Sequence, residues 1–369
     1  MKSVCFITMR PNRGATGGPG GVLYLIQQAL GRTVGDIRCH YIFQPIVNRS
    51  FKGKRDKLNW LLFKLYFTLH PHTYYVVHDI CTARLLAKMH RHYSLVFHQQ
   101  GPIVQEKMNF GEKLSAEQVR FWQEVENTAF SKAISVHFPS KGAEKMYFDN
   151  MYASCDRNFI NVGAPLYNTI PEETATLVNE LKKEEDTITF FSLGTLTEAK
   201  GQDRTVSVIE RYIQKSHKKV RYIIVGNGPL AESVCKRCSE IAEYYKNFEF
   251  IYYPKLTHSE VLYIHSISDV YIMLHRISIF DFATLEAMQN GCALALSPIG
   301  GNLDFNVDDN VLFLRNAEDA EVLSDADIAV LKQKNKDAFE KFFSLTAFRQ
   351  EYIKLIKNYF SAEPNIITN

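Results

Sequence analysis

Short apolar runs that end at polar or small residues recur along the chain and predict buried β-strands. In the first half they cover residues 3–9, 73–79, 93–100 and 133–140, and in the second half they cover residues 187–194, 221–228, 248–254, 269–275 and 292–298. Amphipathic stretches of helical length separate most of these runs. Strands that alternate with helices predict parallel sheets, so we expect an α/β fold.

Residues 165–171 (PLYNTIP) separate the two series of strands and have the composition of a linker. A chain of 369 residues is also too long for one ordinary α/β domain. We therefore predict two Rossmann-like, doubly wound domains, the first over residues 1–165 and the second over residues 166–345. The segment from about residue 325 to residue 360 is helical by its pattern.

The two halves carry opposite charge, although the formal net charge of the whole chain is only +3. Residues 1–165 contain 21 Lys and Arg against 11 Asp and Glu, whereas the remaining residues contain 22 against 29. A basic first half favours an anionic partner, such as a membrane surface, a phosphorylated acceptor or nucleic acid. No aromatic-basic module supports nucleic acid, so we expect no nucleic-acid binding.

A basic cluster leads into an apolar stretch in this first half. Five cationic side chains lie between residues 49 and 57, and the apolar residues 58–69 (LNWLLFKLYFTL) follow them. This stretch is shorter than the roughly 20 residues that a membrane-spanning helix needs. It fits a helix in the interface of an anionic membrane, with Trp60 toward the bilayer. It fits equally well a core helix that follows a charged loop.

The cysteine pattern favours reduced thiols. The chain has seven scattered cysteines, and a strand-like segment rather than a signal-peptide pattern follows Lys2. We therefore expect a cytoplasmic protein. Cys235 and Cys238 form an isolated CxxC on a predicted helix, with no second pair that would complete a metal site.

Two segments of the second half have the composition of a phosphate or nucleotide site. The strand that ends at Gly194 is followed by Thr195 and then by Lys200 at the start of a helix. Helix amides and a Lys ammonium suit a diphosphate, although a surface Lys before a helix is common. Gly226 and Asn227 follow the next strand, and their turn fits either a planar ring against the backbone or a purely structural role.

The third segment, residues 278–302, has the most specific pattern. Glu286 lies among Ala283, Leu285 and Ala287, and a carboxylate in apolar surroundings requires a partner. Two ribose hydroxyls would supply that partner. A nearby Arg or Lys is the alternative.

Taken together, these segments resemble the retaining GT-B glycosyltransferases of the large family 4. The shared features are Gly-x-Leu before Lys-Gly, then Val-Gly-x-Gly-Pro, then Leu-Glu-Ala-Met and a Gly-Gly pair, in this order over residues 187–315. The resemblance implies two Rossmann-like domains that face each other across a cleft and close around the substrates. It also implies a C-terminal helix, residues 346–369, that crosses back to the N-terminal domain.

The resemblance assigns roles to individual residues. The first domain would bind the acceptor, and the second would bind the nucleotide sugar, with Glu286 on the ribose and Lys200 on the diphosphate. His98 would position the transferred sugar. The donor-binding residues implied in this way are Gly20, Gly21, Gly194, Thr195, Lys200, Gly226, Asn227, Phe282, Ala283, Thr284 and Glu286.

Two positions depart from the family pattern. Thr195 stands where an Arg usually helps the Lys to neutralise the diphosphate, and Ser278 stands where a Glu usually contacts the sugar. Asp281, three residues after Ser278, is in a position to reach a similar place. The candidate catalytic residues are therefore Lys200, His98, Ser278 and Asp281.

The implied reaction moves a hexose-type sugar from a UDP- or GDP-linked donor to a glycan or lipid-linked glycan, with retention at the anomeric carbon. Asp325 and Asp327 lie near a helix start and fit capping rather than a metal site, so we predict neither a metal nor another cofactor. By analogy we expect bacterial surface-polysaccharide biosynthesis at the cytoplasmic membrane face, with residues 49–69 in peripheral contact with the membrane.

Three alternatives remain. The loop over residues 17–21 permits a Rossmann oxidoreductase, although its spacing is not Gly-x-Gly-x-x-Gly. A GT-B sugar-nucleotide epimerase would share the fold without transferring a sugar. A non-catalytic GT-B partner subunit would account for Thr195 and Ser278.

Overall fold

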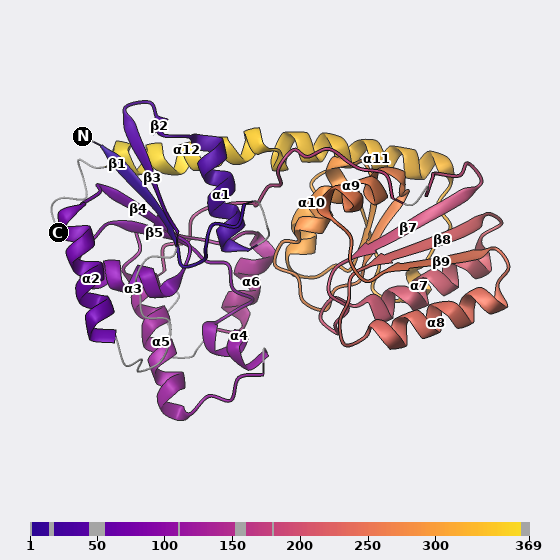
Figure 1. Ribbon diagram of the computed structural model, residues 1–369, viewed down its shortest axis with the longest axis horizontal. Coiled ribbons are helices and arrows are strands. Elements are labelled where there is room, and N and C mark those ends of the chain that lie inside the picture. The colour runs from indigo at the N-terminus through magenta and orange to yellow at the C-terminus, as the bar shows by residue number, and fades with distance from the viewer. Residues whose placement is uncertain are drawn as a thin grey trace. The chain divides into compact units, whose positions relative to one another are not determined.

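The computed structural model describes residues 2–14, 18–43, 56–109, 111–151, 160–178 and 181–362. The chain forms two compact units (Figure 1). Unit 1 combines Met1–Pro171 with Leu345–Asn369, and unit 2 is Glu172–Ser344. Each unit is built on its own six-stranded, mainly parallel sheet. The prediction of an α/β fold with two Rossmann-like domains is confirmed.

Sheet A of unit 1 has the strand order β2-β3-β1-β4-β5-β6. Its strands are parallel, except that β2 pairs with β3 in the antiparallel direction. β1 lies in the interior of the sheet because its apolar residues are fully buried. The strands are β1 (Ser3–Thr8), β2 (Thr33–Val34), β3 (Ile37–Phe43), β4 (Tyr74–Val77), β5 (Tyr93–Val96) and β6 (Val136–His137).

The helices of unit 1 cover both faces of sheet A. α1 and α12 contact each other on one face, and α3 and α5 contact each other on the opposite face (Figure 1). α12 follows unit 2 in the sequence but packs on unit 1, where Tyr359 stacks on Tyr74 with ring centroids 4.1 Å apart. The helices are α1 (Pro19–Leu30), α2 (Asp56–Leu69), α3 (Ile80–Lys88), α4 (Ile103–Asn109), α5 (Ala116–Ser131), α6 (Lys141–Asp149) and α12 (Leu345–Ala362).

α2 buries only a narrow face. Phe63 and Phe67 are buried, and the ring of Phe67 packs edge-on against Tyr75 of β4. The rest of the helix exposes large apolar side chains, namely Leu58, Leu61, Leu62, Leu65, Tyr66 and Leu69. Residues 49–55 of the basic cluster lie outside the described part of the chain. Among the described helices, none is long and apolar enough to cross a membrane.

Sheet B of unit 2 is entirely parallel and has the strand order β12-β11-β10-β7-β8-β9. The chain runs outward from β7 to β9, returns to place β10 beside β7, and then runs outward in the other direction. The two halves of the sheet therefore diverge between β7 and β10. The strands are β7 (Thr187–Leu193), β8 (Lys219–Val225), β9 (Phe248–Tyr253), β10 (Val270–Met273), β11 (Ala293–Leu296) and β12 (Val311–Phe313).

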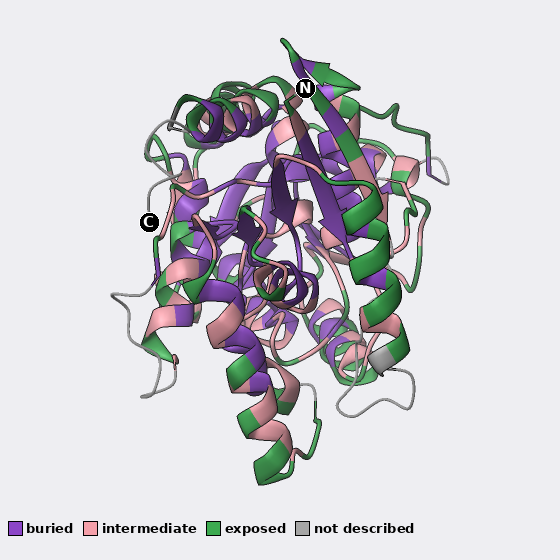
Figure 2. Ribbon diagram, turned by 90° about the vertical axis from the view of Figure 1, so that its left-hand side faces the viewer, coloured by how far each residue is buried: buried purple, intermediate pink, exposed green. Residues whose placement is uncertain are grey.

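Helices cover both faces of sheet B as well. α7 and α8 lie on one face, and α9, α10 and α11 lie on the other (Figure 1). In unit 1 burial concentrates in the strands and on the inner sides of the helices, as Figure 2 shows. The strands of unit 2 are buried as well. The helices are α7 (Gln202–Lys215), α8 (Ala231–Tyr244), α9 (His258–Ile267), α10 (Phe282–Gln289) and α11 (Asp325–Ala338), with shorter helical turns over Gly300–Phe305, Ala317–Asp319 and Phe339–Phe343.

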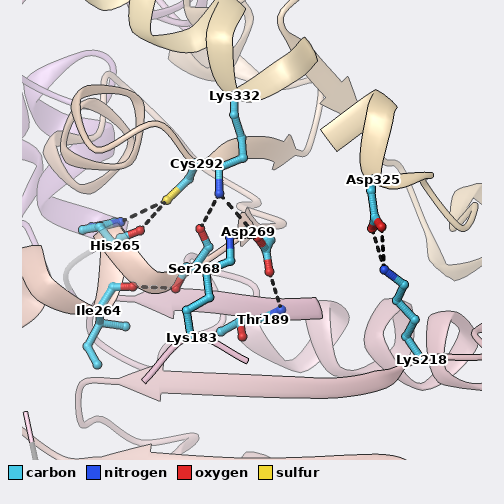
Figure 3. Close-up of polar contacts among 10 residues, drawn as sticks. All are labelled: Lys183, Thr189, Lys218, Ile264, His265, Ser268, Asp269, Cys292, Asp325 and Lys332. Carbon is cyan, nitrogen blue, oxygen red and sulfur yellow. Dashed lines mark hydrogen bonds and ion pairs between the residues drawn. The ribbon is translucent and has the colours of Figure 1, made fainter. Parts of the chain in front are cut away.

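An ion-pair cluster joins α11 to the amino end of sheet B (Figure 3). Asp269, just before β10, lies 2.8 Å from Nζ of Lys183 and 3.4 Å from Nζ of Lys332 on α11. Its second carboxylate oxygen accepts a hydrogen bond from the amide of Thr189 at 3.1 Å. Lys332 also donates to the carbonyl of Ser268. Asp269 is buried, so these contacts compensate the loss of water around its charge.

Candidate functional site

The carboxyl ends of β7 and β10 form the topological switch point of sheet B, where open α/β sheets bind their ligands. The loop after β7 ends at Gly201, which is the N-cap residue of α7 and has a φ of +73°. A Cβ at this position would lie 1.9 Å from the carbonyl oxygen of Leu274, which follows β10. Only glycine allows this approach, and the approach brings Lys200 beside the residues that follow β10.

Lys200 is paired with a carboxylate at the switch point. Its Nζ lies 2.7 Å from Oδ1 of Asp281 and 3.4 Å from Nε2 of His275, and Oδ2 of Asp281 lies 3.5 Å from the Tyr271 hydroxyl. Burial raises the pKa of the Asp281 carboxyl, but Lys200, His275 and Tyr271 outweigh burial and hold that pKa below its usual value. Burial lowers the pKa of His275 to about 4, so this imidazole is neutral at pH 7.

The N-terminus of α10 faces the same place. Asp281 is its N-cap residue, but the carboxylate of Asp281 accepts no hydrogen bond from the helix. The first amides of α10 belong to Phe282, Ala283 and Thr284, and the first amides of an α-helix have no partner within the helix. They give this helix end a partial positive charge. Together with the Lys200 ammonium, they can hold an anion.

The segment before α10 is shaped by the Gly-Gly pair. A Cβ on Gly300 would lie 2.1 Å from the carbonyl oxygen of Ser278, and a Cβ on Gly301 would lie 1.6 Å from that of Ile279. The two glycines therefore allow close backbone packing. Ser278 is buried, and among the described residues its hydroxyl has no hydrogen-bond partner. Its side chain is free to take a new hydrogen bond.

Glu286 lies one turn into α10 and has a histidine partner rather than the Arg or Lys considered from the sequence. Its Oε1 lies 2.8 Å from Nε2 of His258, whose Nδ1 lies 2.5 Å from Oε2 of Glu173. His265 Nε2 is 3.7 Å from Oε2 of Glu286, beyond hydrogen-bonding distance. The hydrogen bond to Glu286 raises the pKa of His258 to about 9, so His258 is an imidazolium at pH 7.

The turns after β7 and β8 are in direct contact. Gly226 has a φ of +138°, and a Cβ there would lie 2.0 Å from the carbonyl oxygen of Gly194. The side chain of Asn227 caps its own turn by accepting a hydrogen bond from the next amide at 2.8 Å. Thr195 is exposed on the neighbouring loop. These residues line the same sheet edge as Lys200, and the contacts of Gly226 and Asn227 are those of a structural turn.

In unit 1, the two predicted glycines lie in the first turn of α1. Gly20 and Gly21 are buried, and a Cβ on Gly20 would lie 2.9 Å from the carbonyl oxygen of Pro11. The loop after β1 therefore packs closely on the start of α1. Residues 15–17 of the same glycine-rich loop lie outside the described part of the chain.

His98 follows β5 and is paired with a second histidine. Its Nε2 lies 2.9 Å from Nδ1 of His78, which follows β4, and the two rings stack with centroids 5.2 Å apart. Burial lowers the pKa of His98 to about 4, and burial together with His98 lowers that of His78. Both imidazoles are therefore neutral at pH 7.

Sequence reasoning missed three histidines that contact the predicted residues. His78 and His275 end their strands as His98 does, so the position of a histidine after an apolar run was a usable signal. No comparable signal marks His258. It follows Thr257, the N-cap residue of α9, and meets Glu286 only through the fold.

The family comparison agrees with this architecture. Residues 173–341 match the family model described as glycosyl transferases group 1. No curated protein sequence matches the chain.

Solved structures resemble the chain over nearly its whole length. Sucrose-phosphate synthase from Thermosynechococcus elongatus has a TM-score of 0.66 at 13% identity and covers 98% of this chain and 100% of its own. An E. coli trehalose-6-phosphate protein bound with UDP-2-fluoro glucose has a TM-score of 0.63 at 12% identity, with 96% and 99% covered. WaaG, a glycosyltransferase involved in lipopolysaccharide biosynthesis, has a TM-score of 0.59 at 12% identity, with the same coverage. The chain thus has the GT-B fold, and residues 173–341 are similar to the glycosyl transferases group 1 family.

Proposed function

We propose that this chain is a retaining glycosyltransferase of family 4 type. It moves a hexose-type sugar from a UDP- or GDP-linked donor to a glycan or lipid-linked glycan, and it needs no metal or other cofactor. One observation carries the proposal: Lys200, the N-terminus of α10 and Glu286 follow one another at the switch point of sheet B. Glu286 lies about 6 Å along α10 from its first residue, given the rise of an α-helix. A nucleoside diphosphate has its phosphates and ribose in the same order.

This arrangement stabilises the charge that the reaction develops. When the glycosyl–phosphate bond breaks, negative charge grows on the departing diphosphate, and fixed donors stabilise it most strongly. Lys200 and the first amides of α10 are such donors. If the acceptor enters on the face that the diphosphate leaves, the configuration is retained without a side-chain nucleophile. The departing phosphate then accepts the proton of the acceptor.

The comparisons support the choice of substrates. The family match lies over the unit that contains Lys200 and Glu286. The E. coli neighbour was solved with UDP-2-fluoro glucose, which favours a UDP-linked donor. WaaG acts in lipopolysaccharide biosynthesis, which favours a glycan acceptor and a role in bacterial surface polysaccharides.

A thermal-shift panel of UDP, GDP, ADP, CDP and NAD tests the proposal. A ligand at about 100 times its dissociation constant adds roughly 2.7 kcal/mol to the free energy of unfolding. We expect UDP or GDP to raise the melting temperature by a few degrees. Glu286→Gln keeps the shape of the side chain but should lose most of this shift, because a neutral amide is a poorer acceptor for two ribose hydroxyls. Glu232→Gln, on the first turn of α8, is the matched control and should keep the shift.

A non-catalytic GT-B partner subunit is the second candidate. Lys200 and Glu286 already have internal partners in Asp281 and His258, which favours weak or absent nucleotide binding. If none of the five nucleotides stabilises the wild type, this candidate replaces the enzyme. Stabilisation by NAD alone would instead support an oxidoreductase, and sugar products formed without an acceptor would support an epimerase.

We also propose that α2 binds the cytoplasmic face of an anionic membrane. Its exposed apolar residues follow helical spacing, since Leu58, Leu61, Leu65 and Leu69 recur at intervals of three or four. Leu61 and Leu69 are 60% and 66% exposed, and a contiguous exposed apolar patch of this kind is typical of an interaction site. Five cationic residues precede the apolar part of the helix in the sequence, and a basic cluster next to an apolar helix attracts anionic headgroups.

Co-sedimentation with phosphatidylglycerol vesicles tests this contact, with phosphatidylcholine vesicles as the neutral comparison. Leu61→Ser together with Leu65→Ser should reduce binding at least tenfold. Val330→Ser is a matched control, because Val330 is an exposed apolar residue on α11, an element of unit 2. Equal binding by the wild type and the double variant would contradict the proposed membrane contact.

A further inference from the structure

The anion site at the end of sheet B already contains a carboxylate that belongs to the chain. Asp281 Oδ1 accepts a hydrogen bond from the Lys200 ammonium at 2.7 Å, and Asp281 directly precedes the first amides of α10. The carboxylate does not cap the helix, so its principal partner is Lys200. A diphosphate that binds Lys200 and these amides needs the same ammonium. Asp281 and the diphosphate therefore compete.

The surroundings make it unfavourable for Asp281 to stay charged after it loses Lys200. The Asp281 carboxylate is largely buried, and burial favours its neutral form. The titratable groups that face it are Lys200, Tyr271, His275 and His265. Of these, only Lys200 is a strong cation, because burial keeps His275 and His265 in their neutral forms. A bound diphosphate would add negative charge at the same place.

We infer that Asp281 is a built-in, proton-linked competitor for the diphosphate. In the structure its carboxylate holds Lys200. A nucleoside diphosphate replaces Asp281 as the ion-pair partner of Lys200, and the displaced carboxylate of Asp281 takes up a proton from solvent. The protonated acid then carries no charge beside the diphosphate and has an O–H that can donate to a phosphate oxygen. This inference rests on the proposed nucleotide site and adds a means of regulation to it: donor binding strengthens as pH falls.

Asp281→Asn tests the inference with little change of shape. Asn removes the negative charge, and it is as good an N-cap residue as Asp, so α10 should still form. Asp281→Ser is the second variant, chosen because Ser is also a good N-cap residue. UDP and GDP are titrated calorimetrically into the full chain at pH 7.5 and pH 8.5, in two buffers that differ in protonation enthalpy. At these pH values the terminal phosphate of the nucleotide is already ionised.

For the wild type, we expect the dissociation constant to rise between pH 7.5 and pH 8.5, by up to about tenfold for one proton taken up. Asp281→Asn should bind at least tenfold more tightly than the wild type at pH 8.5. It should also take up about one proton fewer per nucleotide. His258 titrates in the same range, with a pKa of about 9, but it is present in both proteins and cancels in the comparison.

The outcomes separate this inference from the proposed function. Equal affinities and equal proton uptake in the wild type and both variants would overturn the competition and leave the glycosyltransferase proposal intact. Weaker binding by both variants, with melting temperatures unchanged, would make Asp281 a direct ligand of the nucleotide and would also overturn it. If neither UDP nor GDP binds the wild type or either variant, both proposals fail together.

Discussion

The buried carboxylate of Glu286 is hydrogen-bonded to His258, with 2.8 Å between Oε1 and Nε2. The other ring nitrogen of His258 faces Glu173, so one imidazolium joins two carboxylates. Glu286 therefore has a cationic partner on α9 within the chain itself. This contact explains how α10 can bury a carboxylate among apolar residues.

His258→Gln should reduce the fall in the free energy of unfolding that accompanies a rise to alkaline pH. The pKa of His258 is about 9 in the folded chain and about 6.5 when unfolded, so its stabilisation is complete below pH 6.5 and is lost as pH rises through 9. The side chain is 39% exposed, so we expect an effect of only about 1 kcal/mol. Urea unfolding should give the wild type a higher free energy of unfolding than the variant at pH 6. At pH 9.5 the two free energies should be equal. If the difference in free energy of unfolding between the two proteins stayed constant with pH, His258 would not be the imidazolium partner of Glu286.

Gly201→Ala should strongly destabilise unit 2. The new Cβ would meet the carbonyl oxygen of Leu274, and backbone cannot move aside as a flexible side chain can. We expect a loss of about 3 kcal/mol or more in the free energy of unfolding. Gly291→Ala is the matched control, because Gly291 has almost the same φ but faces the flexible side chain of Lys336. The Gly291→Ala variant should lose only about 1 kcal/mol in the free energy of unfolding. Equal losses would mean that the backbone conformation alone, rather than the contact with Leu274, requires the glycine.

Asp269→Asn should weaken the cluster that joins α11 to sheet B. The amide cannot neutralise Lys183 and Lys332, and the site is buried. We expect a loss of about 2–3 kcal/mol, measured by chemical unfolding. Asp325→Asn removes another carboxylate drawn in Figure 3, but its side chain is 74% exposed and pairs with Lys218. That variant should lose less than about 1 kcal/mol. A similar loss of free energy of unfolding in both variants would show that burial does not decide how much each carboxylate contributes.

His78 and His98 should stay neutral across the physiological range. Burial lowers the pKa of His98 to about 4 and lowers that of His78 as well. Nitrogen-15 NMR of the imidazole rings should therefore show no titration of either ring between pH 5.5 and pH 8. His78→Phe removes the partner of His98 and should broaden or shift the His98 signals, because the shared hydrogen bond holds its tautomer. Titration of either ring above pH 5.5 would contradict this geometry.

Local pattern was enough to predict the class of fold. Strand-length apolar runs separated by amphipathic helices require burial on both faces of a parallel sheet, and this requirement is a property of each segment by itself. The expected strands 187–194, 221–228 and 248–254 correspond to β7, β8 and β9. The apolar stretch 58–69 was harder to interpret, because its composition does not show which side is covered. In the structure, the side of α2 that contains Phe63 and Phe67 is buried against unit 1.

The sequence by itself determined the order of chemical groups along each local element. The spacing within residues 281–286 places amides at the start of α10 and Glu286 one turn later, because helix geometry is local. Only the tertiary structure decided what these groups face. Lys200 and Asp281 are 81 residues apart, and His258 and Glu286 are 28 apart, so neither pair is visible in a local pattern. They meet because β10 returns to lie beside β7, and that pairing depends on the packing of the whole sheet.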